Sequence, residues 1–156
     1  LEMSDSRYLL TQTGRSKIIV VLAGGVFDII HPGHIYTLSA SKALGDVLVV
    51  AVARDKIVTA SKGPPLNDEW KRAELVGSLK CVDVAILGSE TDIFETVVRV
   101  GPDIIAIGYD QKHDEKFLAE EAKRRGLRLK VVRLGSPIPH IKSSSIVKNQ
   151  DVMKEF

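Results

Sequence analysis

Apolar and polar residues follow one another along the chain in blocks whose lengths suit strands and helices in turn. Short apolar runs with the length of buried strands occur at residues 17–23, 46–53, 82–87, 103–107 and 127–134. Patterns with a helical period lie between them, at about 32–44, 67–79, 92–100 and 114–125. Strands that alternate with helices predict right-handed crossovers, and therefore a parallel sheet with helices on both faces.

The predicted architecture is therefore an α/β fold with a Rossmann-like, doubly wound, five-stranded parallel sheet. The first helix is expected to bury a face made of Tyr36, Ala40, Ala43 and Leu44, which recur at helical spacing. A polar loop is expected after the second strand, and a final helix is expected to follow the serines near residue 145.

Residues 1–16 are mostly polar and do not join the alternation, so we expect a tail there and one domain at 17–156. The segment 8–15 resembles the last strand and turn of a winged-helix domain. The match is short, so we expect an ordinary terminal tail, with the remnant of a preceding winged-helix domain as the alternative.

Polar and glycine clusters follow four of the predicted strands, at residues 24–34, 54–62, 108–111 and 140–145. In an open parallel sheet, ligands bind outside the carboxyl ends of the strands. We therefore expect these four clusters to converge at one edge of the sheet and to form the functional site.

The first cluster contains the most informative chemistry. Gly24 and Gly25 allow a tight turn and a close approach to a ligand. Pro32 suits the first position of a helix, which makes His31 the expected N-cap and puts His34 on the same face one turn later. Two imidazoles at a helix N-terminus, where free N–H groups already favour an anion, indicate a polyphosphate site.

Two other readings of this cluster are weaker. Zinc needs three or four ligands, and the remaining candidates (His113, His140 and Cys81) have no diagnostic spacing, so no metal site is predicted. Asp55 lies 22 residues after Gly33, near the position of the ribose-binding acid in dinucleotide sites. The glycine pattern G-x-G-x-x-G that such sites require is absent.

Composition narrows the class of protein. The net charge of +2 is too small to indicate nucleic acid as the main partner, and 5% aromatic residues supply no stacking platform for single strands. A single cysteine excludes an internal disulfide and suits a reducing compartment. No apolar run has the length of a membrane span and no signal-peptide pattern is present. We therefore expect a cytoplasmic protein with no membrane partner.

The turn after the first strand resembles the signature G-x-F-D-x-x-H-x-G-H of the nucleotidyltransferase superfamily that includes the cytidylyltransferases, through Gly25, Phe27, Asp28, His31, Gly33 and His34. The resemblance covers about residues 17–150. The segments 25–36, 52–55 and 107–111 are most similar to the archaeal FAD synthases, which transfer AMP from ATP to FMN. Glycerol-3-phosphate cytidylyltransferase, which uses CTP, remains an alternative because both acceptors present a phosphate monoester.

The resemblance also implies roles for individual residues. The implied catalytic residues are His31, His34 and Lys62. The implied nucleotide-binding residues are Gly25, Val26, Phe27, Gly33, Gly108, Tyr109, Asp110, Gln111, Ser143, Ser144 and Ser145. The implied acceptor-binding residues are Asp28, Arg54, Asp55 and Arg72. Mg²⁺ is expected to accompany ATP, and a homodimer is implied.

Three further expectations concern the acceptor and the class of function. A flavin would need an apolar slot, to which Ile29, Ile30, Trp70 and Tyr109 are candidate contributors. A regulator that binds nucleotides without catalysis, or a structural scaffold, would not need the paired histidines. Those histidines therefore favour an enzyme.

Overall fold

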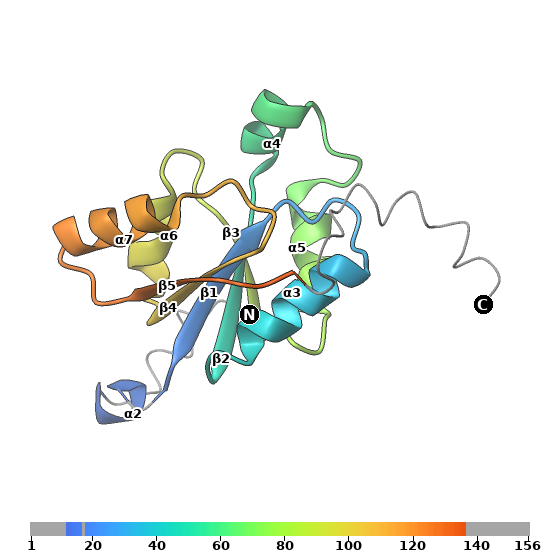
Figure 1. Ribbon diagram of the computed structural model, residues 1–156. Coiled ribbons are helices and arrows are strands. Elements are labelled where there is room, and N and C mark those ends of the chain that lie inside the picture. Colours follow the sequence, from blue (N-terminus) through green and yellow to red (C-terminus); the bar gives the residue numbers. More distant parts are fainter. Residues whose placement is uncertain (1–11, 17, 137–156) are drawn as a thin grey trace.

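The computed structural model describes residues 12–16 and 18–136 (Figure 1). Its centre is a sheet in which every ladder is parallel and the strand order is β3-β2-β1-β4-β5. The strands are β1 (Val20–Gly25), β2 (Val47–Val52), β3 (Val84–Leu87), β4 (Ile104–Ile107) and β5 (Lys130–Arg133). This order confirms the predicted doubly wound, five-stranded sheet.

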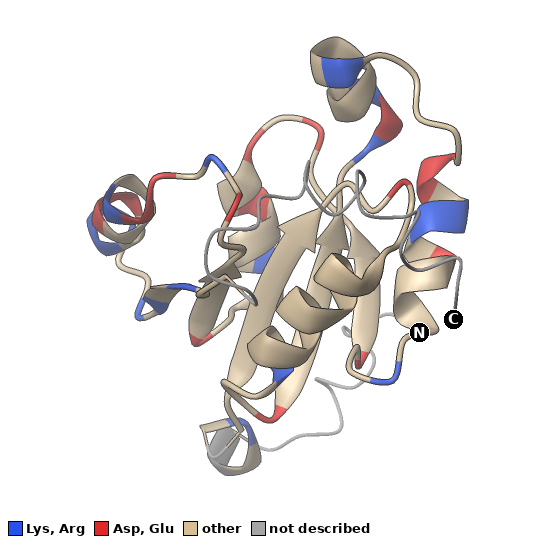
Figure 2. Ribbon diagram, turned by 45° about the vertical axis from the view of Figure 1, so that its right-hand side comes forward, with Lys and Arg blue, Asp and Glu red and all other residues tan. Residues whose placement is uncertain are grey.

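The helices lie on both faces of the sheet, as predicted, with α3 and α5 on one side and α6 and α7 on the other (Figure 1). Their bounds are α2 (Gln12–Ser16), α3 (Pro32–Lys42), α4 (Asp55–Lys62), α5 (Glu69–Gly77), α6 (Ile93–Val100) and α7 (Glu115–Arg124). Charged residues are absent from β1 to β4 and gather on the helices and loops around them (Figure 2). The four strands can therefore be buried on both faces.

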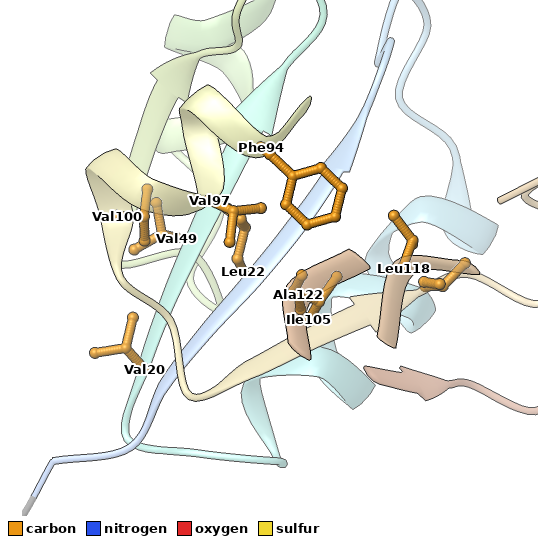
Figure 3. Close-up of a cluster of buried hydrophobic side chains, with 10 residues drawn as sticks. Val20, Leu22, Val49, Phe94, Val97, Val100, Ile105, Leu118 and Ala122 are labelled. Atoms are coloured by element: carbon orange, nitrogen blue, oxygen red, sulfur yellow. The ribbon is translucent and has the colours of Figure 1, made fainter. Parts of the chain in front are cut away.

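Two apolar clusters form the core, one on each face of the sheet. Successive residues of a strand point to opposite faces, so Val20 and Leu22 join one cluster while Val21 and Ala23 join the other. Side chains of α6 and α7 complete the first cluster around Phe94 (Figure 3). Residues 20–23 are all 5% exposed or less, which confirms this part of the apolar run as a strand covered on both faces, whereas Ile19 lies before β1 and is 44% exposed.

Two local predictions were wrong. The segment after β2 forms the helix α4, where a polar loop was expected. Only Val58 in α4 is buried, so the segment lacks the apolar period by which a helix is recognised in sequence.

The buried face of α3 was also predicted wrongly: Tyr36 is 44% exposed, while Leu38 and Ser41 are buried. Small and polar residues here approach the sheet closely, which a count of apolar positions does not reveal.

Aspartates pin the amino-terminal edge of the sheet. Asp46, Asp83 and Asp103 each stand immediately before a strand, and each carboxylate accepts a backbone N–H from a neighbouring strand segment. The donors are Ile19, Leu48 and Val20, at 2.8, 2.7 and 2.8 Å respectively. We call these three residues the strand-start aspartates. They fix the relative positions of neighbouring strands at the edge opposite the predicted site.

The helix α2 is held against this same edge by Arg15. Its guanidinium donates to the carbonyl oxygens of Ile18 and Gly101, each at 2.7 Å, and to the carboxylate of Asp103 at 3.2 Å. The rest of the winged-helix-like segment and the predicted final helix lie outside the described residues, so the proposed domain boundary near residue 16 stays a prediction. Within residues 12–16 and 18–136, no helix is long and apolar enough to cross a membrane.

Candidate active site

The carboxyl ends of the strands carry the segments that the sequence indicated. The segments after β1 and β4 meet there, because these strands are neighbours although β2 and β3 lie between them in sequence (Figure 1). The side-chain amide of Gln111 donates to the carbonyl oxygen of Gly24 at 2.8 Å and so joins the two segments. In doubly wound sheets, ligands bind at this point, where the order of the strands reverses.

The turn after β1 is unusually constrained. Phe27 has a φ of 55°, a left-handed conformation that is rare for a bulky residue, and its ring is almost fully buried. A Cβ on Gly25 would lie 2.9 Å from two atoms of that ring, so only glycine fits there without a shift. The same ring meets His34 edge-on, with centroids 5.3 Å apart. Backbone strain at Phe27 therefore serves to support a histidine of the signature.

The two histidines cap α3 and hold each other in place. Gly33 N–H donates to Nδ1 of His31 at 3.1 Å, and His31 N–H donates to Nδ1 of His34 at 3.3 Å. The rings stack with centroids 3.9 Å apart. Because each Nδ1 accepts a hydrogen bond, the proton of each neutral ring lies on Nε2. The pair can thus offer two Nε2–H donors to an anion at the helix N-terminus.

Burial keeps His34 neutral. Burial, the largest cause, and the neighbouring His31 together lower the pKa of His34 from 6.5 to about 4, although the carboxylate of Asp110 opposes the shift. At neutral pH the His34 imidazole is therefore uncharged. It can act as a hydrogen-bond donor to developing negative charge without first losing or gaining a proton.

The segment after β4 forms a turn closed by one side chain. The carbonyl oxygen of the Gln111 side chain accepts the N–H of Gly108 at 2.8 Å, and Gln111 N–H donates to the Gly108 carbonyl at 3.1 Å. Burial and the neighbouring Asp110 raise the pKa of Tyr109. Gly108 is buried, and an added Cβ would touch Thr37 and Gln111 at 3.4 Å. Glycine at this position lets α3 and the turn lie close together.

Arg133, at the end of β5, holds this turn from the other side. Its guanidinium donates to the carbonyl oxygens of Gly108 at 3.0 Å and Gln111 at 2.9 Å, and also to that of His113. The carboxylate of Glu115, in the first turn of α7, completes its contacts. The sequence analysis missed this residue, because a lone arginine at the end of a strand belongs to no motif and its partners become neighbours only after folding.

A second arginine, Arg72 in α5, contacts the turn after β1. Arg72 has no exposed surface, and all three of its guanidinium nitrogens are bonded within the protein. It donates to the carbonyl oxygens of Asn67 at 3.0 Å and Val26 at 2.7 Å, and to the carboxylate of Asp55 at 2.6 Å. One side chain thus connects the turn after β1, the start of α4 and the start of α5.

Asp28, in the signature turn after β1, is also bonded to the segment that precedes α5. Its carboxylate accepts the backbone N–H groups of Leu66 and Asn67, both at 2.9 Å, and these two bonds lower the pKa of Asp28. The side-chain amide of Asn67 returns a bond to the Asp28 carbonyl at 2.9 Å. The signature turn is therefore tied directly to the segment between α4 and α5.

Comparison with known proteins decides the family. The model of the cytidylyltransferase-like family matches residues 22–150, which include the histidine pair and most of the sheet. The chain belongs to the cytidylyltransferase-like family. This result confirms the resemblance predicted from the signature at residues 25–34.

Several members of the family with assigned names are similar over most of the chain. One from Methanosarcina mazei, named FAD synthase, is 49% identical over 87% of this chain and 89% of its own length. Another FAD synthase, from Aciduliprofundum boonei, is 52% identical over 75% of this chain and 78% of its own length. A third, from Archaeoglobus profundus, is 49% identical over 88% and 90% of the two chains.

Solved structures agree on the fold. A crystal structure of a protein from Thermoplasma volcanium, described as a lipopolysaccharide core biosynthesis protein, is 49% identical and has a TM-score of 0.75, covering 78% of this chain and 99% of that chain. A pantoate-β-alanine ligase from Francisella tularensis, at 13% identity and a TM-score of 0.60, covers 96% of this chain and 74% of its own and shares the fold alone.

The structure changes the view of the acceptor-binding residues that the family resemblance implied. Direct contact between Arg72 and an acceptor does not fit a side chain with no exposed surface, so that expectation was wrong. Asp55 forms an ion pair with Arg72, at 2.6 Å. Asp28 and Asp55 retain some exposed surface, and acceptor binding by them stays a prediction.

Arg54 lies differently from the other residues of this group. Its Nε is 3.3 Å from a carboxylate oxygen of Glu69, and its Nη2 is 3.4 Å from one of Glu90. The first contact lacks hydrogen-bond alignment, which leaves the Nε–H buried without an acceptor. Lys62, exposed at the end of α4, is the other cation beyond β2 that the family resemblance selected. These two side chains remain candidates for phosphate contacts.

The remaining predicted residues divide into two groups. Ser143, Ser144 and Ser145, implied by the family's C-terminal motif, lie outside the described residues and stay a prediction. Among the candidates for an apolar slot, Ile29 and Trp70 are 64% and 70% exposed, whereas Ile30 and Tyr109 are partly buried. Both exposed side chains neighbour segments that the Asp28–Leu66 bond brings together, since Ile29 follows Asp28 and Trp70 is the second residue of α5.

Proposed function

We propose that this protein transfers AMP from ATP to FMN, forming FAD and pyrophosphate. The observation that carries the proposal is the identity of about half of all aligned residues with relatives named FAD synthase, over three quarters or more of the chain. The histidine pair at the start of α3 agrees with it, because a protein without catalysis would not need two fixed donors there.

The reaction exchanges one bond to phosphorus for another. An oxygen of the FMN phosphate attacks the α-phosphorus of ATP, the bond from that phosphorus to the bridging oxygen of the β-phosphate breaks, and pyrophosphate carries away the electron pair. Such a transfer depends on positioning and charge stabilisation more than on covalent help from the protein. The task of the site is therefore to hold two anionic groups together and to stabilise the charge that develops between them.

His31 and His34 supply this stabilisation. Their Nε2–H groups donate to oxygens of the α-phosphate and to the bridging oxygen as charge accumulates there, aided by the N-terminal end of α3. His34 is neutral at pH 7 because burial lowers its pKa to about 4, so it needs no change of protonation during the step. Lys62 and the predicted serines would add contacts to the leaving phosphates.

The nucleotide and the acceptor occupy opposite sides of the pair. Gly108, Tyr109, Asp110 and Gln111 border the side of β4, where we assign the adenosine. Arg54 borders the side of β2, where its side chain stays 30% exposed at the start of α4, and it is the candidate partner of the FMN phosphate. The turn formed by Gly25, Val26, Phe27 and Gly33 lies between the two sides.

Mg²⁺ is assigned to the substrate rather than to a protein cage. Among residues 12–16 and 18–136, no three side chains of His, Cys, Asp or Glu lie close enough together to hold a metal ion. Mg²⁺ readily keeps water ligands and takes phosphate oxygens. We therefore describe the nucleotide substrate as MgATP, in which the ion neutralises charge on the triphosphate.

The proposed function is tested by offering ATP or CTP, each with Mg²⁺, together with FMN or glycerol 3-phosphate. Pyrophosphate release and FAD formation are recorded for each pair. We expect release with ATP and FMN and the appearance of FAD. Release only with CTP and glycerol 3-phosphate would contradict the proposal and indicate the alternative cytidylyltransferase. Nucleotide binding without release in any pair would indicate a regulator.

Variants of the histidine pair separate catalysis from folding. His31→Asn keeps an N-cap acceptor, which asparagine supplies well, but removes the Nε2–H donor. We expect this variant to retain the thermal stability of the wild type and to lose about a hundredfold or more in kcat, the usual scale for one charge-stabilising donor. Unchanged kcat in the folded variant would disprove the role assigned to His31.

A further inference from the structure

The turn after β4 is held by contacts that converge on one side chain. Residues 108–114 form neither helix nor strand, so their carbonyl oxygens need partners from elsewhere in the protein. Three of these carbonyls, those of Gly108, Gln111 and His113, accept hydrogen bonds from the guanidinium of Arg133. The turn therefore depends on Arg133 for much of its shape.

The position of Arg133 is itself fixed by the sheet and by a helix. It is the last residue of β5, where it lies in register with Ile107, and the next residue continues the ladder through the bond from Leu134 N–H to the Ile107 carbonyl at 2.8 Å. The carboxylate of Glu115 in α7 accepts from Nε. Sheet, helix and turn thus meet at one planar group whose donors point in fixed directions.

The pinned turn presents two residues toward the histidine pair. Gln111 bonds Gly24 of β1, which holds the turn against the signature segment. Asp110 acts on the pKa of His34, so its carboxylate lies within electrostatic reach of the catalytic pair. Movement of the turn would therefore displace the surface beside which a nucleoside would lie, without touching the histidines themselves.

We propose that Arg133 is a positioning residue for nucleotide binding, acting through the backbone of residues 108–113. This inference rests on the proposed function only for the identity of the nucleotide. Arg133 is not assigned to contact the substrate. Its role is to keep the turn in the shape that receives the nucleoside, and a single ammonium group could not satisfy the same set of carbonyls.

The experiment compares Arg133→Gln with Arg128→Gln, a matched control. Arg128 is an exposed arginine five positions earlier, so its substitution makes the same change of charge. ATP and CTP affinities are measured by calorimetry without any acceptor, and KM and kcat are then measured with FMN. We expect Arg133→Gln to weaken ATP binding and raise KM for ATP by about tenfold or more, as for losing hydrogen bonds from a charged group.

Other readouts separate positioning from general support of the fold. KM for FMN should stay within about twofold of the wild type. We expect kcat to fall less than the nucleotide affinity, because the lost contacts support the nucleotide equally in the ground state and in the transition state. Arg133→Lys should bind ATP with an affinity between those of wild type and Arg133→Gln, because it restores some of the donors. The control should match the wild type throughout.

Three results would overturn the inference. These are an equal rise in KM for ATP and FMN, a fall in melting temperature with unchanged ATP affinity, and the same loss in the control variant. Because nucleotide affinity is measured without FMN, a wild type that binds ATP but makes no FAD would refute the proposed function and leave this inference testable by the variants. A wild type that binds neither nucleotide would refute both.

Discussion

At the scale of single residues, the histidine pair acts as one unit. Each ring receives a backbone N–H at Nδ1, and the caps of the helix therefore also set the tautomers of the pair. His31 as N-cap and His34 one turn later were predictable from sequence, because proline and helix periodicity are local signals. The support from Phe27 was not, since its left-handed backbone and ring contact arise only in the folded turn.

The lowered pKa of His34 makes a prediction for stability. In the unfolded chain His34 gains a proton near its ordinary pKa of 6.5, whereas in the folded protein it does so only near 4. Between these values the unfolded state binds more protons, so stability must fall as the pH falls. We expect the free energy of unfolding of the wild type to decrease from pH 6.5 to 4 more than that of His34→Gln, which keeps a polar cap at N3.

Urea denaturation at a series of pH values measures this difference. Carboxylates that titrate in the same range contribute to both proteins, so subtraction of the two curves isolates His34. Parallel curves for wild type and variant would show that the histidine has the same pKa in both states.

At the scale of elements, the sequence predicted the strands that are apolar throughout and the helices that have clear caps. It did not predict the helices whose buried face holds few apolar side chains. Strands with apolar residues throughout and helices with clear caps, such as those beginning after Asp68 and Asp92, were found near their observed bounds. Helix α4 buries only Val58, and α3 buries Leu38 together with the small residues Gly33 and Ser41, so neither contact face carried a continuous apolar pattern. Such faces are determined by the distance between backbones, which a sequence does not state.

The strand-start aspartates give a prediction about the sheet. In Asp83→Ala, Leu48 N–H loses its acceptor and Lys42 loses its ion pair. We expect the free energy of unfolding to fall by about 1–3 kcal/mol, the cost of an unsatisfied, partly buried donor. Since this edge lies opposite the histidines, kcat and KM should not change. Chemical denaturation and steady-state kinetics check both parts.

Glu120→Ala serves as the control, because Glu120 is an exposed carboxylate on α7. Its unfolding free energy should equal that of the wild type within experimental error. A loss of activity in Asp83→Ala without loss of stability would contradict the division between the two edges.

At the scale of the whole molecule, Arg72 joins parts that are far apart in sequence. It is fully buried and bonds the turn after β1, the first residue of α4 and the segment before α5. The sequence analysis gave this arginine contact with the acceptor. In the structure its partners are the Asp55 carboxylate, the Val26 carbonyl and the nearby Asn67 carbonyl, and their convergence is a product of the fold.

Removal of Asp55, the carboxylate partner of Arg72, tests how far the fold depends on this arginine. In Asp55→Ala the buried guanidinium keeps two carbonyl partners but loses its counter-charge. We expect a loss of about 2–3 kcal/mol in unfolding free energy, less than for a fully buried pair because Asp55 reaches solvent. Activity should fall as well, since a guanidinium without its counter-charge is held less firmly against Val26 in the signature turn.

Asp55→Ala combined with Arg72→Met distinguishes the two effects. The double variant buries no unpaired charge and should recover part of the stability, while activity stays low because replacing Arg72 removes its bond to Val26. Recovery of both stability and activity would show that Arg72 has no positioning role. Denaturation and kinetics on the same preparations provide the comparison.

The placement of the strand-start aspartates also has an evolutionary consequence. They secure strand alignment from one edge, so inheritance of the scaffold does not require inheritance of the loops at the other edge. Under the proposed function, the segment between β2 and α5 borders the acceptor. A lineage that retains Asp55, Leu66 and Asn67 can therefore exchange the rest of this segment, and with it the acceptor, while the sheet keeps its register. A chimaera that carries this segment from a relative of different specificity should therefore fold with a near-native melting temperature and adopt the donor's choice of acceptor.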